Sequence, residues 1–221
     1  MGGDMALTGL HGKARSGKNT VGDILSKRGY VQMSFADPLK KIIDKYLGAV
    51  TRTEDDRDEV QEFFVYDKNL FKVGNYLGWD STQTALFIVR FSTVMEQYRT
   101  NRCDAGDTYR VSYRTFIQLL GTDVCRHIEE GVWTRLLAEK LDGLDSDVVV
   151  TDVRFDNEAE LIEQMSGYVV EVVNSNAKEY GHSSETRISD KYISSVIVND
   201  SSLVELESMV YKLLEGEENG N

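Results

Sequence analysis

The residues with the clearest chemical potential lie in a loop near the start of the chain. Gly12 is followed after four residues by Gly17 and Lys18, which is the G-x-x-x-x-G-K spacing of a phosphate-binding loop, or P-loop. Glycines let backbone N–H groups approach an anion at a helix N-terminus, and the lysine adds a positive charge. We therefore predict a polyphosphate site. Its residues are Gly12, Lys13, Arg15, Ser16, Gly17, Lys18, Asn19 and Thr20.

The loop departs from the usual pattern directly after its lysine. Asn19 stands where most P-loops have Ser or Thr as a Mg²⁺ ligand, and the hydroxyl is displaced to Thr20. Adenylate kinases are similar to this sequence at these positions. That resemblance implies that water links much of the metal to the protein.

A carboxylate is predicted beside this loop. Asp152 follows three valines and a threonine at 148–151, so we expect it at the carboxyl end of a buried strand, where it could hold Mg²⁺ or the waters around it. The alternative is structural, because Asp often ends a strand and caps the next helix.

The arginines bear on what accepts the phosphate, because phosphoryl transfer depends on positioning and on charge stabilisation. A guanidinium group can bind phosphate oxygens through two parallel hydrogen bonds. The alternative for each arginine is a surface ion pair of little energetic value. The candidates near the ends of predicted elements are Arg114, Arg126, Arg154 and Arg187.

An acceptor that already bears a phosphate needs such clamps, whereas a hydroxyl acceptor needs a general base. Asp37 is the candidate base. Its place before Pro38 equally favours a helix N-cap followed by proline at the first helical position.

The order of predicted elements positions these residues. Strands at 5–9, 30–34, 148–151, 168–173 and 196–198 alternate with helices, which predicts an α/β fold: a P-loop kinase-like, three-layer arrangement with a five-stranded parallel sheet and helices on both faces. We treat 1–221 as a single domain. The irregular, aromatic-rich stretch 49–112 is predicted to be a helical insertion. The polar stretch 174–191 is predicted to be a lid-like loop, with an ordinary surface loop as the alternative.

Composition excludes several classes of protein. The 221 residues include 25 Lys and Arg against 37 Asp and Glu, a net charge of −12, which argues against binding of a nucleic-acid polymer. No apolar run approaches the roughly 20 residues that cross a bilayer, so no membrane association is expected. Two cysteines and the lack of a secretory signal indicate a cytoplasmic protein.

Taken together, these residues resemble the bacteriophage deoxynucleoside monophosphate kinases, a branch of the P-loop nucleotide kinases. The resemblance is carried by 12–20, by 35–40, by 118–123 with Arg126 and Trp133, and by 152–154 and 182–185. It implies transfer of the γ-phosphoryl group of ATP, with Mg²⁺, to a deoxynucleoside 5′-monophosphate. It also implies the host-cell cytoplasm, if the protein is phage-encoded, and a homodimer.

The resemblance also assigns roles to residues. It implies that Lys18 holds the donor phosphates and that Asp152 organises Mg²⁺ through water. Arg114, with Arg126, would grip the acceptor phosphate, while Arg154 and Arg187 would neutralise the transferring group. Phe35, Gln118 and Trp133 would line the acceptor pocket, although core packing is an equal alternative for Phe35 and Trp133. His182 would serve the lid or lie on the surface, and the insertion 49–112 would shape base and sugar recognition.

Two alternative functions remain open from the sequence. One is a P-loop kinase of a hydroxyl acceptor, similar to dephospho-coenzyme A kinase, with Asp37 as the base. The other is a switch that hydrolyses a nucleoside triphosphate without an acceptor. Against the switch, the sequence has no second nucleotide-specificity motif such as Asn-Lys-x-Asp. Asn199 and Asp200 give only a weak hint of a loop on the adenine side.

Overall fold

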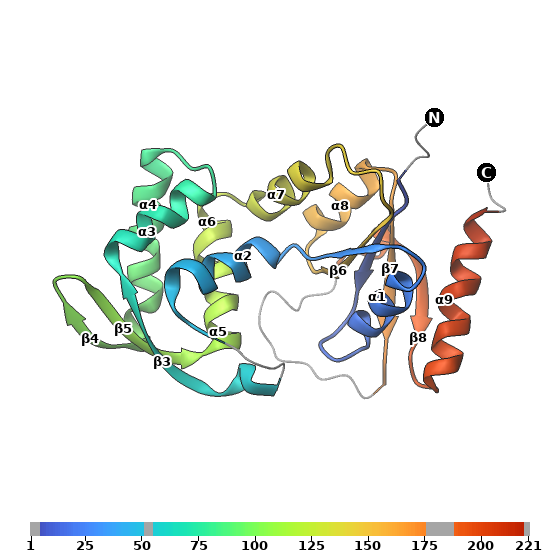
Figure 1. Cartoon of the computed structure of the whole chain (residues 1–221), viewed down its shortest axis with the longest axis horizontal. Coiled ribbons are helices and arrows are strands. Elements are labelled where there is room, and N and C mark those ends of the chain that lie inside the picture. Colours follow the sequence, from blue (N-terminus) through green and yellow to red (C-terminus); the bar gives the residue numbers. More distant parts are fainter. Residues whose placement is uncertain (1–4, 51–54, 176–187, 219–221) are drawn as a thin grey trace. The chain divides into compact units, whose positions relative to one another are not determined.

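Apolar stretches far apart in the sequence form one parallel sheet in the computed structural model (Figure 1), which describes residues 5–50, 55–175 and 188–218. The strand order is β2-β6-β1-β7-β8. The bounds are Leu7–His11 for β1, Val31–Met33 for β2, Val148–Val153 for β6, Tyr168–Val173 for β7 and Ile193–Val198 for β8. All neighbouring pairs run parallel, which confirms the predicted five-stranded parallel sheet.

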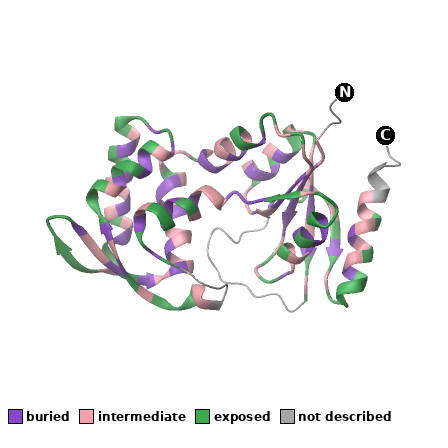
Figure 2. Cartoon of the chain, viewed as in Figure 1, coloured by how far each residue is buried: buried purple, intermediate pink, exposed green. Residues whose placement is uncertain are grey.

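The central strands are buried on both faces. Val148, Val149 and Val150 of β6 are fully buried, and Thr8 of β1 pairs with Val149. β-Branched side chains fill a pleated surface well, and burial of both faces is typical of parallel sheets. The run of valines therefore accounts for the place of β6 inside the sheet, and Figure 2 shows buried residues along the central strands.

Helices cover both faces of this sheet, as predicted. On one face, Leu10 packs in a cluster with Ile24 of α1 (Lys18–Ser26) and Val210 of α9 (Leu203–Glu218). On the other, a Cβ added at Gly9 would lie 3.4 Å from Cγ1 of Ile162 in α8 (Asp156–Gln164). Successive strand residues point to opposite faces, so Leu10 and Gly9 mark the two layers.

The chain divides into two compact units. Unit 1 comprises residues 1–35 and 137–221 and contains the parallel sheet, and unit 2 comprises residues 36–136. The predicted insertion, 49–112, lies inside unit 2. No helix within the described ranges is both long and apolar enough to cross a membrane.

Unit 2 is built on an antiparallel sheet that the sequence analysis did not predict. Its order is β3-β5-β4, with β3 at Val60–Tyr66, β4 at Arg99–Cys103 and β5 at Gly106–Ser112. Its helices are α2 (Asp37–Ile42), which continues as a π-helix to Leu47, α3 (Asp67–Tyr76), α4 (Ser81–Met95), α5 (Tyr113–Gln118), α6 (Arg126–Ile128) and the start of α7 (Val132–Leu141). Short turns lie at 55–58, 96–98 and, outside this unit, 190–192, and a π-helix spans 119–125. The insertion is thus helical only in part.

Aromatic side chains make the core of unit 2. The rings of Phe63 and Phe116 lie 4.8 Å apart between centroids, and the ring of Phe91 meets that of Tyr109 edge to face at 5.7 Å. Each such pair contributes about 0.5–1.5 kcal/mol beyond the stabilisation that comes from the area it buries. Packing therefore explains part of the aromatic richness of 49–112, whereas Tyr66 and Phe71 are exposed.

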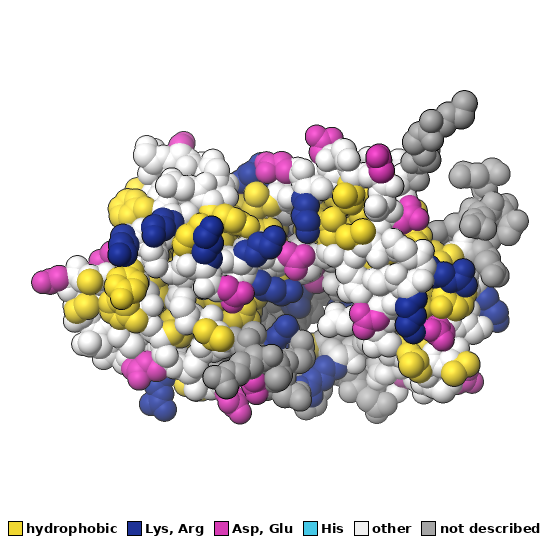
Figure 3. Space-filling model, in the orientation of Figure 1, with side chains coloured by type: hydrophobic (Ala, Val, Ile, Leu, Met, Phe, Trp, Pro, Cys, Tyr) yellow, Lys and Arg dark blue, Asp and Glu magenta, His cyan; other side chains and the backbone are white. Residues whose placement is uncertain are grey.

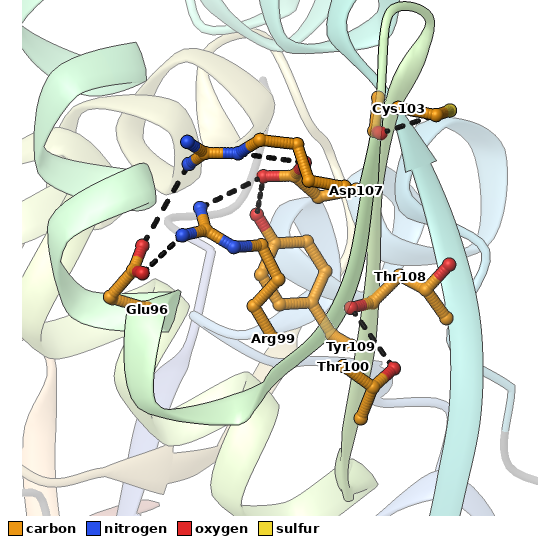
Figure 4. A network of polar contacts seen from close by, with 9 residues as sticks. Glu96, Arg99, Thr100, Cys103, Asp107, Thr108 and Tyr109 are labelled. Carbon is orange, nitrogen blue, oxygen red and sulfur yellow. Dashed lines mark hydrogen bonds and ion pairs between the residues drawn. The ribbon is translucent and has the colours of Figure 1, made fainter.

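Charged side chains fasten the β4–β5 hairpin to the end of α4 (Figure 4). The Arg99 guanidinium donates to Glu96 and, through Nη1 at 3.3 Å, to Oδ2 of Asp107, which also accepts from the Tyr109 hydroxyl at 3.3 Å. Arg102 Nε lies 3.6 Å from Oδ1 of Asp107. Two cations meet two carboxylates here, so we interpret the cluster as structural.

A second polar cluster joins α3 to the start of α7. Arg135 donates to both carboxylate oxygens of Glu129, at 2.8 and 2.9 Å, and to the carbonyl of Leu77 at 2.8 Å. The Trp79 indole N–H donates to Glu129 at 2.7 Å. These bonds, those from Arg135 first, lower the pKa of Glu129. The paired charges cap the end of α3 and hold two segments of unit 2 together.

Candidate functional site

The loop from Gly12 to Gly17 turns so tightly that only glycine fits at its ends. Gly12 and Gly17 have φ values of 142° and 103°, and Arg15 one of 62°. A Cβ at Gly12 would lie 2.3 Å from the carbonyl oxygen of Val172, and one at Gly17 would lie 2.1 Å from Nδ2 of Asn199. Residues other than glycine rarely adopt these backbone conformations. The spacing of the two glycines therefore reflects the curvature of the loop.

The loop ends at the N-terminus of α1, where an anion is favoured. Gly17 is the N-cap and supplies no side chain to bond the first helical N–H groups, which leaves them available to a ligand. The Ser16 side chain is 1% exposed, and its hydroxyl has no hydrogen-bond partner among the described residues. An orphaned buried hydroxyl is costly, so a polar ligand inside the loop fits this site.

Lys18 brings its charge back over the loop. Its Nζ donates to the carbonyl oxygens of Gly12 and Lys13, both at 2.7 Å. Both of these acceptors are uncharged carbonyl groups. Charge-assisted bonds to phosphate oxygens would be stronger.

Asp152 lies beside the loop, near the end of β6, the strand that pairs with β1. Its Oδ2 accepts from the Ser34 hydroxyl at 2.6 Å, and its Oδ1 accepts from the Phe35 N–H at 2.7 Å. These two bonds orient the Asp152 carboxylate. No three His, Cys, Asp or Glu side chains in the described ranges gather as a metal site.

Arg154 begins the turn from β6 into α8. Its backbone N–H donates to Oε2 of Glu158 at 2.8 Å, as does that of Phe155 at 3.2 Å. Glu158 is only 3% exposed. This buried carboxylate fixes the backbone that carries the half-buried side chain of Arg154 in unit 1.

Arg114 lies in the first turn of α5 in unit 2, after the N-cap Ser112, whose hydroxyl accepts from the Thr115 N–H. Its Nε donates to Oδ1 of Asp58 at 2.6 Å. The two side chains are 17% and 49% exposed. The acidic segment before β3 therefore contacts the arginine that the sequence assigned to an acceptor phosphate.

The other residues assigned to the acceptor lie along the following helices of unit 2. Gln118 ends α5, and Arg126 begins α6 after the π-helix; both are half-buried. Trp133 is 5% exposed, and its indole N–H donates to the carbonyl of Gly121 at 3.2 Å. Phe35, in unit 1, is 3% exposed. The burial of Phe35 and Trp133 favours packing over direct contact with a substrate.

Asp37 is not the N-cap that the sequence predicted. Ala36 holds that position, and Asp37 lies in the first turn of α2 with Pro38. Its carboxylate is 3.5 Å from Nζ of Lys40. The prediction was wrong by one residue because Ala36 already has helical backbone angles.

The stretch 174–191 is described only at its ends. The Ser175 N–H donates to Asp200 at 2.8 Å, and the Ser189 N–H donates to Asp156 at 2.8 Å. The two bonds from Ser189 lower the pKa of Asp156. His182 and Arg187 lie outside the described residues, so their roles stay predictions.

Sequence reasoning missed two residues that contact the candidate site. Ser34 binds Asp152, and Asn199 binds the carbonyl of Ser16 at 2.9 Å. Ser34 precedes the Phe35 segment that carried the resemblance, and Asn199 belongs to a pair already noted. Neither contact could be inferred from the spacing of residues, because each depends on where the sheet places the ends of β2 and β8.

Comparison with known proteins identifies the family. Residues 51–210 match the family model described as deoxynucleotide monophosphate kinase, which is well over half of the chain. This chain belongs to the deoxynucleotide monophosphate kinase family. The resemblance drawn from the sequence is therefore confirmed.

Individual relatives agree with this assignment. The deoxynucleoside-5′-monophosphate kinase of Escherichia phage T5 is 30% identical, over 87% of this chain and 89% of its own length. A protein of Acanthamoeba polyphaga mimivirus, provisionally named a deoxynucleotide monophosphate kinase, is 27% identical over 93% of this chain and 94% of its own. The crystal structure of TT1252 from Thermus thermophilus shares the fold, with a TM-score of 0.50, 14% identity, and coverage of 97% and 98%.

Family membership decides between the functions left open by the sequence. The protein is an enzyme that transfers a phosphoryl group to a deoxynucleoside monophosphate. A hydroxyl acceptor with Asp37 as base, and a switch without an acceptor, are thereby set aside.

Proposed function

We propose that this kinase transfers the γ-phosphoryl group of ATP, with Mg²⁺, to the 5′-phosphate of a deoxynucleoside monophosphate, and releases ADP and the deoxynucleoside diphosphate. The observation that carries this proposal is the loop of unit 1. It combines two tightly packed glycines, an orphaned buried hydroxyl on Ser16 and the cation of Lys18 at the start of α1.

The donor phosphates are proposed to lie inside this loop. Backbone N–H groups at the start of α1 and the Ser16 hydroxyl would donate to phosphate oxygens, and Lys18 would exchange its two carbonyl acceptors for the triphosphate tail. Lys13 and Arg15 have exposed side chains at the rim of the loop. Asn19 and Thr20 follow in the first turn of α1.

The residues present fit a magnesium ion held mostly through water. Mg²⁺ keeps several waters and takes one or two carboxylates together with substrate phosphates, and Asp152 is a carboxylate oriented by two hydrogen bonds. Bound there, the ion would neutralise charge on the donor phosphates. Ser34 and the Phe35 N–H would hold the carboxylate in place.

The acceptor is proposed to bind through unit 2. Arg114 and Arg126 would hold its phosphate, with Gln118 on the same run of helices and the 49–112 insertion shaping recognition of base and sugar. Figure 3 shows Lys and Arg side chains over α2 and α3, where Lys41, Lys45, Lys68 and Lys72 are exposed. On a chain of charge −12, such a face favours the approach of an anion.

The transfer itself requires no general base on the protein. An oxygen of the acceptor phosphate forms a bond to the γ-phosphorus while the bond to the β-phosphate oxygen breaks, and ADP leaves. Arg154, Arg187 and Lys18 would neutralise the charge that spreads over the transferring group. We extend the proposal to a lid-like role for 174–191, to a homodimer and to the host-cell cytoplasm.

A panel of deoxynucleoside and ribonucleoside monophosphates, each with ATP and Mg²⁺, tests the proposal by product analysis. We expect a diphosphate from at least one deoxynucleoside monophosphate and loss of turnover when EDTA removes the metal. ADP release at the same rate without any monophosphate, or undiminished turnover in EDTA, would contradict it.

A further inference from the structure

Asn199 is anchored by its main chain just after β8. Its backbone N–H donates to the carbonyl of Val173 at 2.7 Å, and its own carbonyl accepts from Nδ2 of Asn174. Both partners lie at the end of the neighbouring strand, β7, or directly after it. The position of Asn199 is therefore set by the sheet.

From this anchor, the Asn199 side chain reaches the P-loop. Its Nδ2 donates to the carbonyl oxygen of Ser16 at 2.9 Å, across 183 residues of sequence. The contact is close, because a Cβ at Gly17 would lie 2.1 Å from the same nitrogen. The amide of Asn199 thus packs directly against the peptide unit that joins Ser16 to Gly17.

The geometry of that peptide unit decides what the contact does. No peptide bond in the described residues is cis, and in a trans peptide the C=O and N–H groups point in opposite directions. Because Asn199 holds the Ser16 carbonyl on its own side, the Gly17 N–H is directed to the opposite side. Glycine tolerates φ of either sign, so without this bond the peptide could flip and turn the carbonyl towards the anion.

We propose that Asn199 is a positioning residue, which fixes the Ser16–Gly17 peptide so that the Gly17 N–H faces the donor phosphates. The inference rests on the proposed role of the loop in binding ATP. Asn199 does not touch the reacting atoms in this account; it acts through one backbone carbonyl. Its effect should therefore appear in the affinity for ATP and not in the affinity for the acceptor.

Two substitutions separate this role from a general one in folding. Asn199→Asp keeps the size of the side chain but places a carboxylate against the Ser16 carbonyl, so we expect the Kd for ATP, measured by calorimetry without acceptor, to rise about tenfold or more. Asn199→Ala removes the single hydrogen bond and should raise that Kd about three- to tenfold. The KM for the deoxynucleoside monophosphate should stay within about twofold of wild type, because the lost bond acts on the donor site alone.

Unit 2 offers a matched control. Asn69 Nδ2 donates to the carbonyl of Tyr46, also at 2.9 Å, so Asn69→Asp loses the same kind of bond at a distant place in the sequence. Denaturant midpoints of all variants show how far each is destabilised. We expect Asn69→Asp to leave the Kd for ATP unchanged at a comparable loss of stability.

Lys18→Ala, measured in parallel, distinguishes the two levels of the proposal. If Lys18→Ala loses ATP while Asn199→Asp binds it within about twofold of wild type, the positioning role is refuted and the donor site stands. Equal increases in KM for ATP and for the monophosphate would also refute the positioning role. If Lys18→Ala itself binds ATP as wild type does, the donor site fails and the inference fails with it.

Discussion

The ion pair between Asp58 and Arg114 leads to a prediction about acceptor affinity. If Arg114 grips the acceptor phosphate, that phosphate must compete with the Asp58 carboxylate, which lies 2.6 Å from Nε of Arg114. Asp58→Asn keeps the shape of the side chain and removes its charge. The substitution should therefore lower the KM for the deoxynucleoside monophosphate.

The size of the effect follows from the exposure of the pair. Asp58 is 49% exposed and Arg114 is 17% exposed, so solvent screens the interaction, and about 0.5–1 kcal/mol is a reasonable value for such a pair. Because 1.4 kcal/mol corresponds to tenfold in affinity, the KM for the monophosphate should fall about two- to fivefold. The KM for ATP should not change.

Initial rates with the monophosphate varied at saturating ATP measure this effect. Arg114→Ala should raise the same KM strongly, and Asp58→Asn should add nothing in that background, because the carboxylate acts through the guanidinium. Asp104→Asn, in the exposed turn between β4 and β5, controls for the loss of one negative charge. A KM that rises or stays constant in Asp58→Asn, or that falls equally without Arg114, would refute the reasoning.

Two further predictions concern the loop and the stability of unit 2. Gly12→Ala should lose ATP binding and about 1–3 kcal/mol of stability, because its φ is 142° and the new Cβ would lie 2.3 Å from a backbone oxygen; wild-type values in urea unfolding and ATP titration would contradict this. The lowered pKa of Glu129 means that its ionised form stabilises the fold above the ordinary pKa of about 4.5 and that this stability is lost as the pH falls through the lowered pKa. Glu129→Gln should cost about 1–2 kcal/mol at pH 7 and have a smaller effect near pH 3; an equal cost at both pH values in urea unfolding would exclude this origin.

The P-loop and the strand before Asp152 could be predicted because their signals are local. The glycine spacing reports a curvature confined to a few residues, and the run of valines at 148–150 reports burial on both faces. The partners of Asp152 are different. Ser34 and Phe35 come beside it only through the pairing of β2 with β6, which depends on the order of strands and not on any local pattern.

The antiparallel sheet of unit 2 could not be predicted for a related reason. β3 pairs with β5 across the whole of α3 and α4, and β4 has the polar sequence Arg-Thr-Asn-Arg-Cys with four of its five residues exposed. An exposed edge strand carries little hydrophobic alternation. Its register depends on the Arg99–Asp107 contact and the aromatic core, which the linear sequence does not reveal.

The binding of ATP by Lys18→Ala tests the central claim most directly, since the whole account depends on the loop of unit 1 holding the donor phosphates. Lys27→Ala, an exposed lysine directly after α1 whose partner is Glu207, is the matched control. We predict that the free energy of unfolding of Lys18→Ala stays within about 1 kcal/mol of the wild-type value, while calorimetric ATP binding and turnover are lost. Lys27→Ala should retain both ATP binding and turnover. ATP affinity and turnover at wild-type levels in folded Lys18→Ala would contradict the account.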